Sequence, residues 1–358
     1  MAEVAVVGAG PVGMLVAILL AQEGTSVEVF DERVSPSERS RAIGIHPPAI
    51  AALFAAGVGA AALDRGVRIE SGEVRCDGRV LGSLRFAEAA RDYPFVLSLP
   101  QHDTENLLRE RLQLLAPDSL HLGTRIENPA ELPGRVIVGA DGLRSGMRTA
   151  AGIGWEALGE PVHYVMADFP DETGFGATAV LLFERGGVVE SFPLPRHRRR
   201  WVALTDRSWP GADRNDLAGL VADRTGIRLS GDAQPVSAFT AGQHLATRMH
   251  SGRVVLAGDA AHEISPIGGQ GMNLGWLDAV ALVAAIRAHL SGDENALARY
   301  DRVRRRSARQ AALQAAFNMA MGKPARGPRL GARNALVRTL AVPPARGIVA
   351  RAFTMRWL

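Results

Sequence analysis

The amino-acid sequence of 358 residues contains little cysteine, lysine and aromatic side chain. Its single cysteine, Cys76, excludes a disulfide framework and any metal site built from several cysteines, and no metal site is predicted. A mechanism that requires a catalytic lysine would have to use Lys323, the one lysine in the sequence. The longest apolar stretches, 12–21 and 279–286, are shorter than the roughly 20 residues of a membrane-spanning helix, so no integral membrane segment is predicted.

The charge balance limits the partners that the chain is expected to have. Its 41 Lys and Arg residues against 37 Asp and Glu give a net charge of +4, far below the excess typical of nucleic-acid-binding proteins, so no nucleic acid is expected. The proportions of hydrophobic (47%) and charged (22%) residues are typical of soluble globular proteins, and the length suits two domains. A strand-like run begins at Glu3 with no basic segment before it, which predicts no secretory signal and a cytoplasmic location.

The N-terminal part of the sequence combines a strand, a glycine-rich turn, a helix and a second strand. The apolar run 2–7 predicts a buried strand that leads into Gly8-Ala9-Gly10-Pro11-Val12-Gly13. A helix is predicted over 14–23 and a strand over 26–30, with Asp31 at the end of that strand. This order is the one found in dinucleotide-binding units.

Each residue type in this unit has a physical reason to be there. Gly8, Gly10 and Gly13 permit a tight turn, a close approach of a pyrophosphate to the backbone and close packing of helix on strand. The N-terminus of the helix offers free N–H groups and a partial positive charge to the phosphates. Asp31 suits the two hydroxyls of an adenosine ribose, and an acid there disfavours the 2′-phosphate of NADP. The unit therefore predicts FAD or NAD at this site.

A second block of sequence favours a flavin. Residues 253–262 (RVVLAGDAAH) are followed by 266–275 (PIGGQGMNLG) and by Asp278-Ala279. This pattern resembles the FAD-dependent aromatic hydroxylase family, the group A flavoprotein monooxygenases with the p-hydroxybenzoate hydroxylase fold. Further segments that match the family in the expected order are Arg41-Ala42, Gln101 and 141–145 (DGLRS).

The resemblance implies FAD as a non-covalent cofactor and NAD(P)H as a transient co-substrate. Asp259 would hydrogen-bond the ribityl hydroxyls, which NAD lacks, and Arg41 would reach the pyrophosphate. The backbone N–H groups at the start of the helix after 266–273 would face the pyrimidine edge of the flavin and favour its reduction. The predicted cofactor-binding residues are Gly8, Gly10, Pro11, Val12, Gly13, Asp31, Glu32, Arg41, Gln101, Ile126, Asp141, Asp259, Pro266, Gly268, Gly271, Met272 and Asn273.

No residue identifies itself as catalytic. In the family that the sequence resembles, reduced flavin captures oxygen as a C4a-hydroperoxide, which transfers one oxygen atom to an electron-rich substrate, so that the cofactor performs the difficult step. The weak candidates are His46 and Pro266. His46 is expected either to face the substrate cavity or to be a surface histidine at a helix start. His262 is expected to have a structural hydrogen-bonding role.

Arginine-rich and aromatic positions in the second half allow two interpretations each. The run 196–200 is predicted to be a solvated hairpin turn rather than a phosphate clamp for the nicotinamide dinucleotide, and 302–309 to be the charged face of a helix. Trp201, Trp209 and Phe192 would either line the substrate cavity or belong to the core of a sheet.

The predicted fold class is α/β, with a Rossmann-like FAD-binding domain of the GR2 type, an inserted β-sheet substrate domain and a helical C-terminal segment. The FAD-binding domain is expected over 1–75, 97–152 and 250–290, the substrate domain over 76–96 and 153–249, and the helical segment over 291–358. The substrate is expected between the flavin ring and the sheet, because ligands favour domain interfaces.

The sequence thus predicts a single-component FAD-dependent monooxygenase. It would use NAD(P)H and O2 to hydroxylate or oxidatively modify an aromatic or polyketide-like small molecule, as a monomer or a homodimer. Two alternatives stay open: a flavin-dependent reductase or dehydrogenase of the geranylgeranyl-reductase type, and a non-catalytic FAD redox sensor. A flavin-dependent halogenase is disfavoured, because its WxWxIP-type segment is missing from the sequence and Lys323 lies outside the predicted flavin domain.

Overall fold

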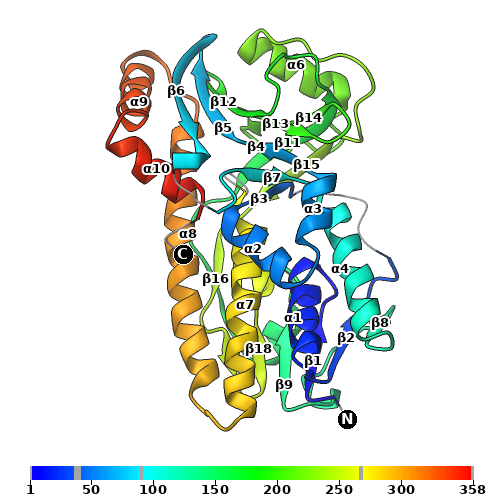
Figure 1. Cartoon of the computed structure of the whole chain (residues 1–358). Helices are drawn as coiled ribbons and strands as arrows, with labels where there is room; N and C mark the ends of the chain where they lie inside the picture. The colour runs from blue at the N-terminus through cyan, green and yellow to red at the C-terminus, as the bar shows by residue number, and fades with distance from the viewer. Residues whose placement is uncertain (1, 36–41, 89–91, 266–268, 356–358) are drawn as a thin grey trace.

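Two β-sheets of different character lie at opposite ends of the molecule (Figure 1). The computed structural model describes residues 2–35, 42–88, 92–265 and 269–355. At the lower end in Figure 1, six strands follow the order β17-β18-β9-β1-β2-β8, and all pairs except β17 with β18 are parallel. These strands are β1 (Val4–Val7), β2 (Val27–Asp31), β8 (Leu120–Leu122), β9 (Val136–Gly139), β17 (His250–Ser251) and β18 (Val254–Leu256).

The parallel sheet forms where the sequence has short valine-rich runs. Strands β1, β9 and β18 are buried at every position, as expected for a sheet that is covered on both faces. Helix α1 (Pro11–Gln22) begins three residues earlier than the sequence predicts, because Pro11 occupies the first helical turn, where its missing N–H costs nothing. Helices α1 and α7 (Gln270–Leu290) pack against each other.

Smaller elements connect and cover this sheet. Further helices in this part of the molecule are α2 (Pro47–Ala55), α3 (Gly59–Arg65), α4 (Gln101–Leu115) and α5 (Gly146–Ala150), with the short 3-10 turns η2 (Pro129–Glu131) and η3 (Gly258–Ala260). Two three-stranded sheets consist of β3 (Gly44–Ile45), β7 (Val96–Ser98) and β4 (Val67–Ile69), and of β10 (Trp155–Ala157), β16 (His244–Ala246) and β19 (His262–Glu263).

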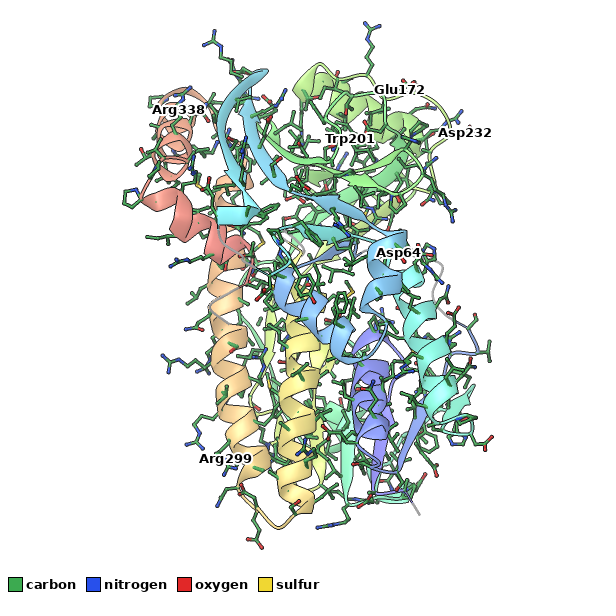
Figure 2. All side chains as sticks on the ribbon, viewed as in Figure 1. Asp64, Glu172, Trp201, Asp232, Arg299 and Arg338 are labelled. Atoms are coloured by element: carbon green, nitrogen blue, oxygen red, sulfur yellow. The ribbon has the colours of Figure 1, made fainter. Side chains whose placement is uncertain are left out.

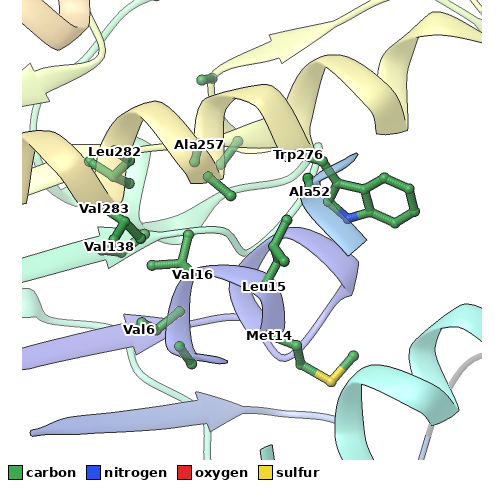
Figure 3. Close-up of a cluster of buried hydrophobic side chains, with 14 of the residues drawn as sticks. Val6, Met14, Leu15, Val16, Ala52, Val138, Ala257, Trp276, Leu282 and Val283 are labelled. Atoms are coloured by element: carbon green, nitrogen blue, oxygen red, sulfur yellow. The ribbon is translucent and has the colours of Figure 1, made fainter. Parts of the chain in front are cut away.

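The largest hydrophobic core lies between the parallel sheet and its helices (Figure 3). Val6 and Val138 from the sheet pack with Leu15 from α1 and Leu282 from α7. Trp276 is fully buried in this core, and its indole N–H donates a hydrogen bond to the carbonyl oxygen of Pro11 at 3.1 Å. The start of α1 is thereby tied to α7.

The upper sheet in Figure 1 is mostly antiparallel and follows the order β15-β11-β14-β13-β12-β5-β6, with only β12 and β5 parallel. Its strands are β5 (Ser71–Cys76), β6 (Arg79–Arg85), β11 (Val162–Pro170), β12 (Thr178–Glu184), β13 (Gly187–Leu194), β14 (Arg198–Thr205) and β15 (Ser237–Ala241). The 3-10 turn η1 (Phe86–Glu88) follows β6, and helix α6 (Arg214–Thr225) covers one face.

Alternation along the strands gives the upper sheet two distinct faces. Trp201, Val189 and Val165 point to the face that α6 covers, and Trp201 is fully buried there (Figure 2). Trp209 packs against the same cluster. For these two tryptophans the core interpretation is therefore correct, whereas Phe192 lies on the opposite face and lines a cavity.

The prediction of a solvated hairpin turn over 196–200 is wrong for its second half. The turn consists of Pro195, Arg196 and His197, and the last two have φ values of +63° and +53°. Arg199 and Arg200 belong to β14 and are buried, because Arg199 pairs with Asp171 and Arg200 pairs with Asp168.

Three C-terminal helices run along the side of the molecule and reach both sheets (Figure 1). They are α8 (Ala296–Gly322), α9 (Gly327–Leu340) and α10 (Ala345–Phe353). Helix α8 packs beside α7, and α9 and α10 contact β6. Among the described residues, α7 alone is long and apolar enough to cross a membrane, but half of that segment is buried, as in the core helix of a globular fold.

Candidate functional site

One large cavity runs from the carboxyl ends of the parallel strands to the upper sheet. Its volume is about 1220 Å³, larger than the roughly 300–1,000 Å³ of an ordinary small-molecule pocket, so it has room for a dinucleotide and a further ligand. Twelve predicted cofactor-binding residues line it: Gly8, Gly10, Pro11, Val12, Asp31, Glu32, Gln101, Ile126, Asp141, Asp259, Gly271 and Met272. Arg41, Pro266 and Gly268 lie outside the described residues.

The glycines of the first turn have separate tasks. Gly8 has a φ of +107°, and a Cβ there would lie 2.2 Å from the carbonyl oxygen of Ala140. A Cβ on Gly13 would lie 1.9 Å from the carbonyl oxygen of Gly8. A Cβ on Gly10, the residue that caps α1, would meet no atom within 4 Å and would enter the cavity. The fold itself requires Gly8 and Gly13, whereas the space around Gly10 is open.

Asp31 lies at the end of β2 and faces the cavity. Its Oδ2 accepts hydrogen bonds from Ala9 N–H at 2.7 Å and Arg33 Nη2 at 2.9 Å, and its Oδ1 accepts them from Arg33 N–H and Nε at 2.8 and 3.0 Å. Burial by itself would raise the pKa of Asp31, but the hydrogen bonds and charge of Arg33 and the Ala9 N–H lower it overall. A ribose hydroxyl would therefore have to replace Arg33 at this carboxylate.

Asp141 follows β9 and lines the same cavity, with one of its carboxylate oxygens buried. Its Oδ2 accepts the N–H of Met147 at 3.0 Å, whereas its Oδ1 is buried and has no hydrogen-bond partner among the described residues. Buried carboxylate oxygens in native proteins almost always have a donor. The open space at Gly10 suits the pyrophosphate of FAD. The described residues therefore fit FAD.

The N-terminus of α7 supplies a second set of backbone groups. Gly269, with a φ of +65°, precedes the helix, and Gly271 and Met272 in its first turn line the cavity. A helix N-terminus carries a partial positive charge that favours a negatively charged ligand group. The side chain of Asn273 instead accepts the N–H of His46 at 2.7 Å and donates to the carbonyl oxygen of Gly44 at 2.8 Å.

His46 is the N-cap residue of α2. The prediction of a surface histidine at this position is wrong, whereas the prediction that it faces the cavity agrees with the structure. It is 2% exposed and lines the cavity. Its ring meets the edge of the Phe353 ring, with 6.4 Å between the centroids. Phe353 comes from the last described helix, α10, so the C-terminal segment forms part of the cavity wall.

A buried charged cluster holds the loop after β18. Asp278 of α7 accepts hydrogen bonds from His262 Nε2 at 2.5 Å, Arg304 Nε at 2.7 Å and Gly258 N–H at 3.1 Å. Burial alone would raise the pKa of Asp278, but the charges and hydrogen bonds of His262 and Arg304 lower it overall. The structural role predicted for His262 is confirmed.

For Arg304, the prediction that it belongs to a charged outer face is wrong, because it is buried against Asp278. An acid at position 278 within an otherwise apolar helix was a signal that a buried cation would be needed. The sequence alone gave no means of choosing Arg304 from the arginines around it.

The upper-sheet side of the cavity is apolar except for a few groups. Phe86, Phe192 and Phe353 form an aromatic wall, and the rings of Phe86 and Phe353 stack with 6.2 Å between centroids. Glu190 stands among them on β13 and was not predicted. The available signal was its position two residues before Phe192, since residues i and i+2 of a strand share a face.

Comparisons with known proteins agree with this geometry. Residues 1–315 match the family model described as FAD binding domain, so the chain belongs to this family. The resemblance found in the sequence and the predicted cofactor, FAD, are thereby confirmed.

Two relatives and one solved structure illustrate the similarity. The chain is 34% identical over 307 residues to 6-methylpretetramide 4-monooxygenase of Streptomyces rimosus, a match that covers 78% of this chain and 54% of the relative. It is 29% identical over 342 residues to 6-hydroxy-3-succinoylpyridine 3-monooxygenase HspB of Pseudomonas putida, covering 85% of this chain and 84% of the relative. The chain thus spans little more than half the length of the first relative and most of the second.

The crystal structure of p-nitrophenol 4-monooxygenase PnpA from Pseudomonas putida has the same fold. The TM-score is 0.87 at 23% sequence identity, and the superposition covers 100% of this chain and 97% of that one. The predicted fold class, an α/β FAD-binding fold with an added β-sheet and a helical C-terminal segment, is confirmed.

Proposed function

We propose that this chain is an FAD-dependent monooxygenase that uses NAD(P)H and O2 to hydroxylate or oxidatively modify an aromatic or polyketide-like small molecule. One observation carries the proposal: a single cavity connects the FAD-binding turn with an aromatic wall on the upper sheet. Both relatives described above are named as monooxygenases, and the names of both describe ring compounds as substrates.

In this proposal the two halves of the cavity hold different groups. The lower half would hold FAD, with the pyrophosphate at Gly10, hydroxyl groups near Asp141 and Asp259, and the flavin near Gly271 and Met272. The upper sheet would be the substrate domain; it includes 71–75 of β5, which the sequence pattern predicts to belong to the FAD-binding domain, besides strands within 76–96 and 153–249. Phe86, Phe192 and Phe353 would pack on the rings of the substrate and exclude water, as offset aromatic contacts do.

The overall reaction balances without a metal or a covalent protein intermediate. FAD, when bound, supplies the transfer of electrons from NAD(P)H to O2 and of one oxygen atom to the substrate. Substrate, NAD(P)H, O2 and one proton then give hydroxylated product, NAD(P)+ and water. The protein residues orient the substrate, keep water out and handle the protons. Dependence on reduced nicotinamide supports the proposed cytoplasmic location.

Three measurements on the purified protein test this function. FAD binding is measured first by thermal unfolding, where FAD at 100 times its Kd is expected to stabilise the folded state by about 2.7 kcal/mol. NADH and NADPH oxidation and O2 uptake are then recorded with a panel of phenols and polycyclic quinols. Mass spectrometry identifies products that have gained one oxygen atom.

We expect at least one panel member to accelerate NAD(P)H oxidation and to gain an oxygen atom, compared with the same mixture without the aromatic compound. Reduction of an added compound without O2 uptake would replace the proposal by a reductase of the geranylgeranyl-reductase type. FAD binding with no turnover of any compound would favour a non-catalytic redox sensor. Failure to bind FAD would contradict the cofactor assignment itself.

A further inference from the structure

Glu190 is a carboxyl group placed where an aromatic substrate would bind. It lies on β13, whose residues Val188, Glu190 and Phe192 point away from the face covered by α6. It is 5% exposed and lines the large cavity together with Phe192 and Phe353. Burial among phenylalanine rings disfavours the charged form of a carboxyl group and costs folding free energy, so an acid at this position suggests a functional role.

Its cationic neighbour on β14, Arg200, is paired with another acid. No described residue makes a hydrogen bond or an ion pair with the carboxyl group of Glu190. The nearby Arg200 of β14 donates from Nε and Nη2 to both carboxylate oxygens of Asp168, at 2.7 and 2.9 Å. Burial raises the pKa of Glu190 to about 8. The pKa of Tyr164, on β11, is raised by burial and further by the charge of Glu190.

A small side cavity adjoins Glu190. It has a volume of about 40 Å³ and is lined by Glu190, Phe192, Phe353 and the α8 residue Asn318, among others. Its other lining residues are Leu181, Phe183, Val188 and Gly322, so the side cavity is apolar apart from Glu190 and Asn318. Apolar cavities of this kind stay dry, and the side cavity therefore adds to the desolvation of Glu190.

We propose that Glu190 binds a phenolic hydroxyl of the substrate and takes its proton. The O–H bond of the phenol breaks, its electron pair stays on the oxygen, and the proton forms an O–H bond with the carboxylate. The phenolate is a more electron-rich ring for oxygen transfer. This inference rests on the proposed function and narrows its substrate class to phenols.

The chemistry suits this position. A general base works best when its pKa lies near the working pH, and the carboxyl group of Glu190 meets this condition whereas an exposed glutamate does not. Titratable groups that line the same cavity from neighbouring elements include Arg200, His46 and Glu263, and Tyr164 of β11 lies in the adjoining core cluster of the sheet. Arg200 is held by Asp168, and burial raises the pKa of Tyr164 above its usual range, which disfavours a tyrosine base beside Glu190.

The first test is a binding measurement that needs neither NAD(P)H nor O2. The FAD-loaded wild type and Glu190→Gln are titrated with p-cresol and with 4-methylanisole by calorimetry between pH 6 and 9. The hydroxyl of p-cresol, like that of tyrosine, ionises near pH 10, and 4-methylanisole has no hydroxyl proton. Glu184→Gln is the matched control, since Glu184 is also buried in the upper sheet but lies outside both cavities.

For the wild type and Glu184→Gln, we expect p-cresol to bind about tenfold more tightly at pH 9 than at pH 6. The ionised carboxylate then accepts a charge-assisted hydrogen bond, which is stronger than a neutral one by roughly a factor of two. Glu190→Gln should show no such gain, and 4-methylanisole should show none with any variant. The same pH dependence in Glu190→Gln, or no binding of p-cresol to the wild type, would overturn the proposal.

The second test addresses proton removal, with whichever phenol the wild type turns over. Glu190→Gln should lose roughly 10²–10⁴-fold in kcat and the rise in rate between pH 6 and 8, whereas Glu184→Gln keeps both. The loss should be smaller for a nitrophenol that is already ionised. Equal losses for both phenols would reduce Glu190 to a structural role.

Discussion

Replacing Gly10 by alanine separates cofactor binding from folding in this protein. The backbone at Gly10 has φ −76° and ψ 179°, which any residue adopts, and an added Cβ would meet no protein atom within 4 Å. Alanine lowers the entropy of the unfolded chain, worth about 0.4–1 kcal/mol, but it is a poorer helix cap than glycine by a similar amount. The free energy of unfolding of the apoprotein should therefore change by less than about 1 kcal/mol.

FAD binding should respond very differently to Gly10→Ala. The added methyl group would stand between the pyrophosphate and the N-terminus of α1, where backbone N–H groups are expected to donate to the phosphates. A hydrogen bond to a charged group contributes about 1.5–3 kcal/mol, so loss of one such bond should raise the Kd of FAD by about 10- to 150-fold.

The assay compares flavin fluorescence during FAD titration with urea unfolding of the apoprotein. Gly13→Ala serves as the matched control, since its Cβ would lie 1.9 Å from the carbonyl oxygen of Gly8 and should destabilise the fold itself. If Gly10→Ala bound FAD with the wild-type Kd, the placement of the pyrophosphate would be wrong. If it unfolded as easily as Gly13→Ala, the division of tasks between these glycines would be wrong.

Two further variants test the buried charges and the cavity wall. Asp278→Asn should lower the free energy of unfolding by about 3–5 kcal/mol at pH 7, because it leaves His262 and Arg304 buried without their counter-charge. The pKa of Asp278 is lowered in the folded state, so its contribution to the free energy of unfolding is complete above the unfolded pKa of about 3.9 and is lost as the pH falls through the folded pKa. Urea unfolding should therefore show the stabilities of the wild type and Asp278→Asn converging in acid. Equal stabilities of the two proteins at pH 7 would contradict the role given to Asp278. Phe353→Ala should weaken p-cresol binding by about 2- to 12-fold, because it removes an aromatic contact of about 0.5–1.5 kcal/mol. Parallel titrations should show an unchanged Kd of FAD. A change in the Kd of FAD alone would show that Phe353 contacts the cofactor and not the substrate.

The residues on the cofactor side of the cavity could be predicted because they lie in short contiguous segments of the sequence. Gly8 and Gly13 are needed by contacts with residues of the same turn and of the neighbouring strand, so no side chain can replace them. The block around Asp259 is short and contiguous. The sequence of such blocks did not show which protein groups also bind a predicted residue. At Asp31, for example, the Arg33 guanidinium already donates hydrogen bonds to the carboxylate.

The substrate side was not predictable, because its residues meet only through distant packing. Phe353 reaches the cavity from a helix near the end of the chain, and Phe86 comes from a turn after β6. Trp201 and Phe192 are both aromatic residues of adjacent strands, yet they face opposite sides of the sheet. Deciding between such positions requires the strand register, which the sequence pattern did not fix.

This difference follows from the kind of group that each side uses. The cofactor is expected to be held mainly by backbone N–H groups at two helix N-termini, and backbone geometry demands glycine at particular positions. The substrate is expected to be held by side chains that project from alternate strand positions, where many residue types fit the same backbone. A cavity built in this way can exchange its substrate chemistry through single residues while the flavin side stays the same. Glu190 is such a residue, since its carboxyl group stands on an ordinary strand position with no backbone requirement for it.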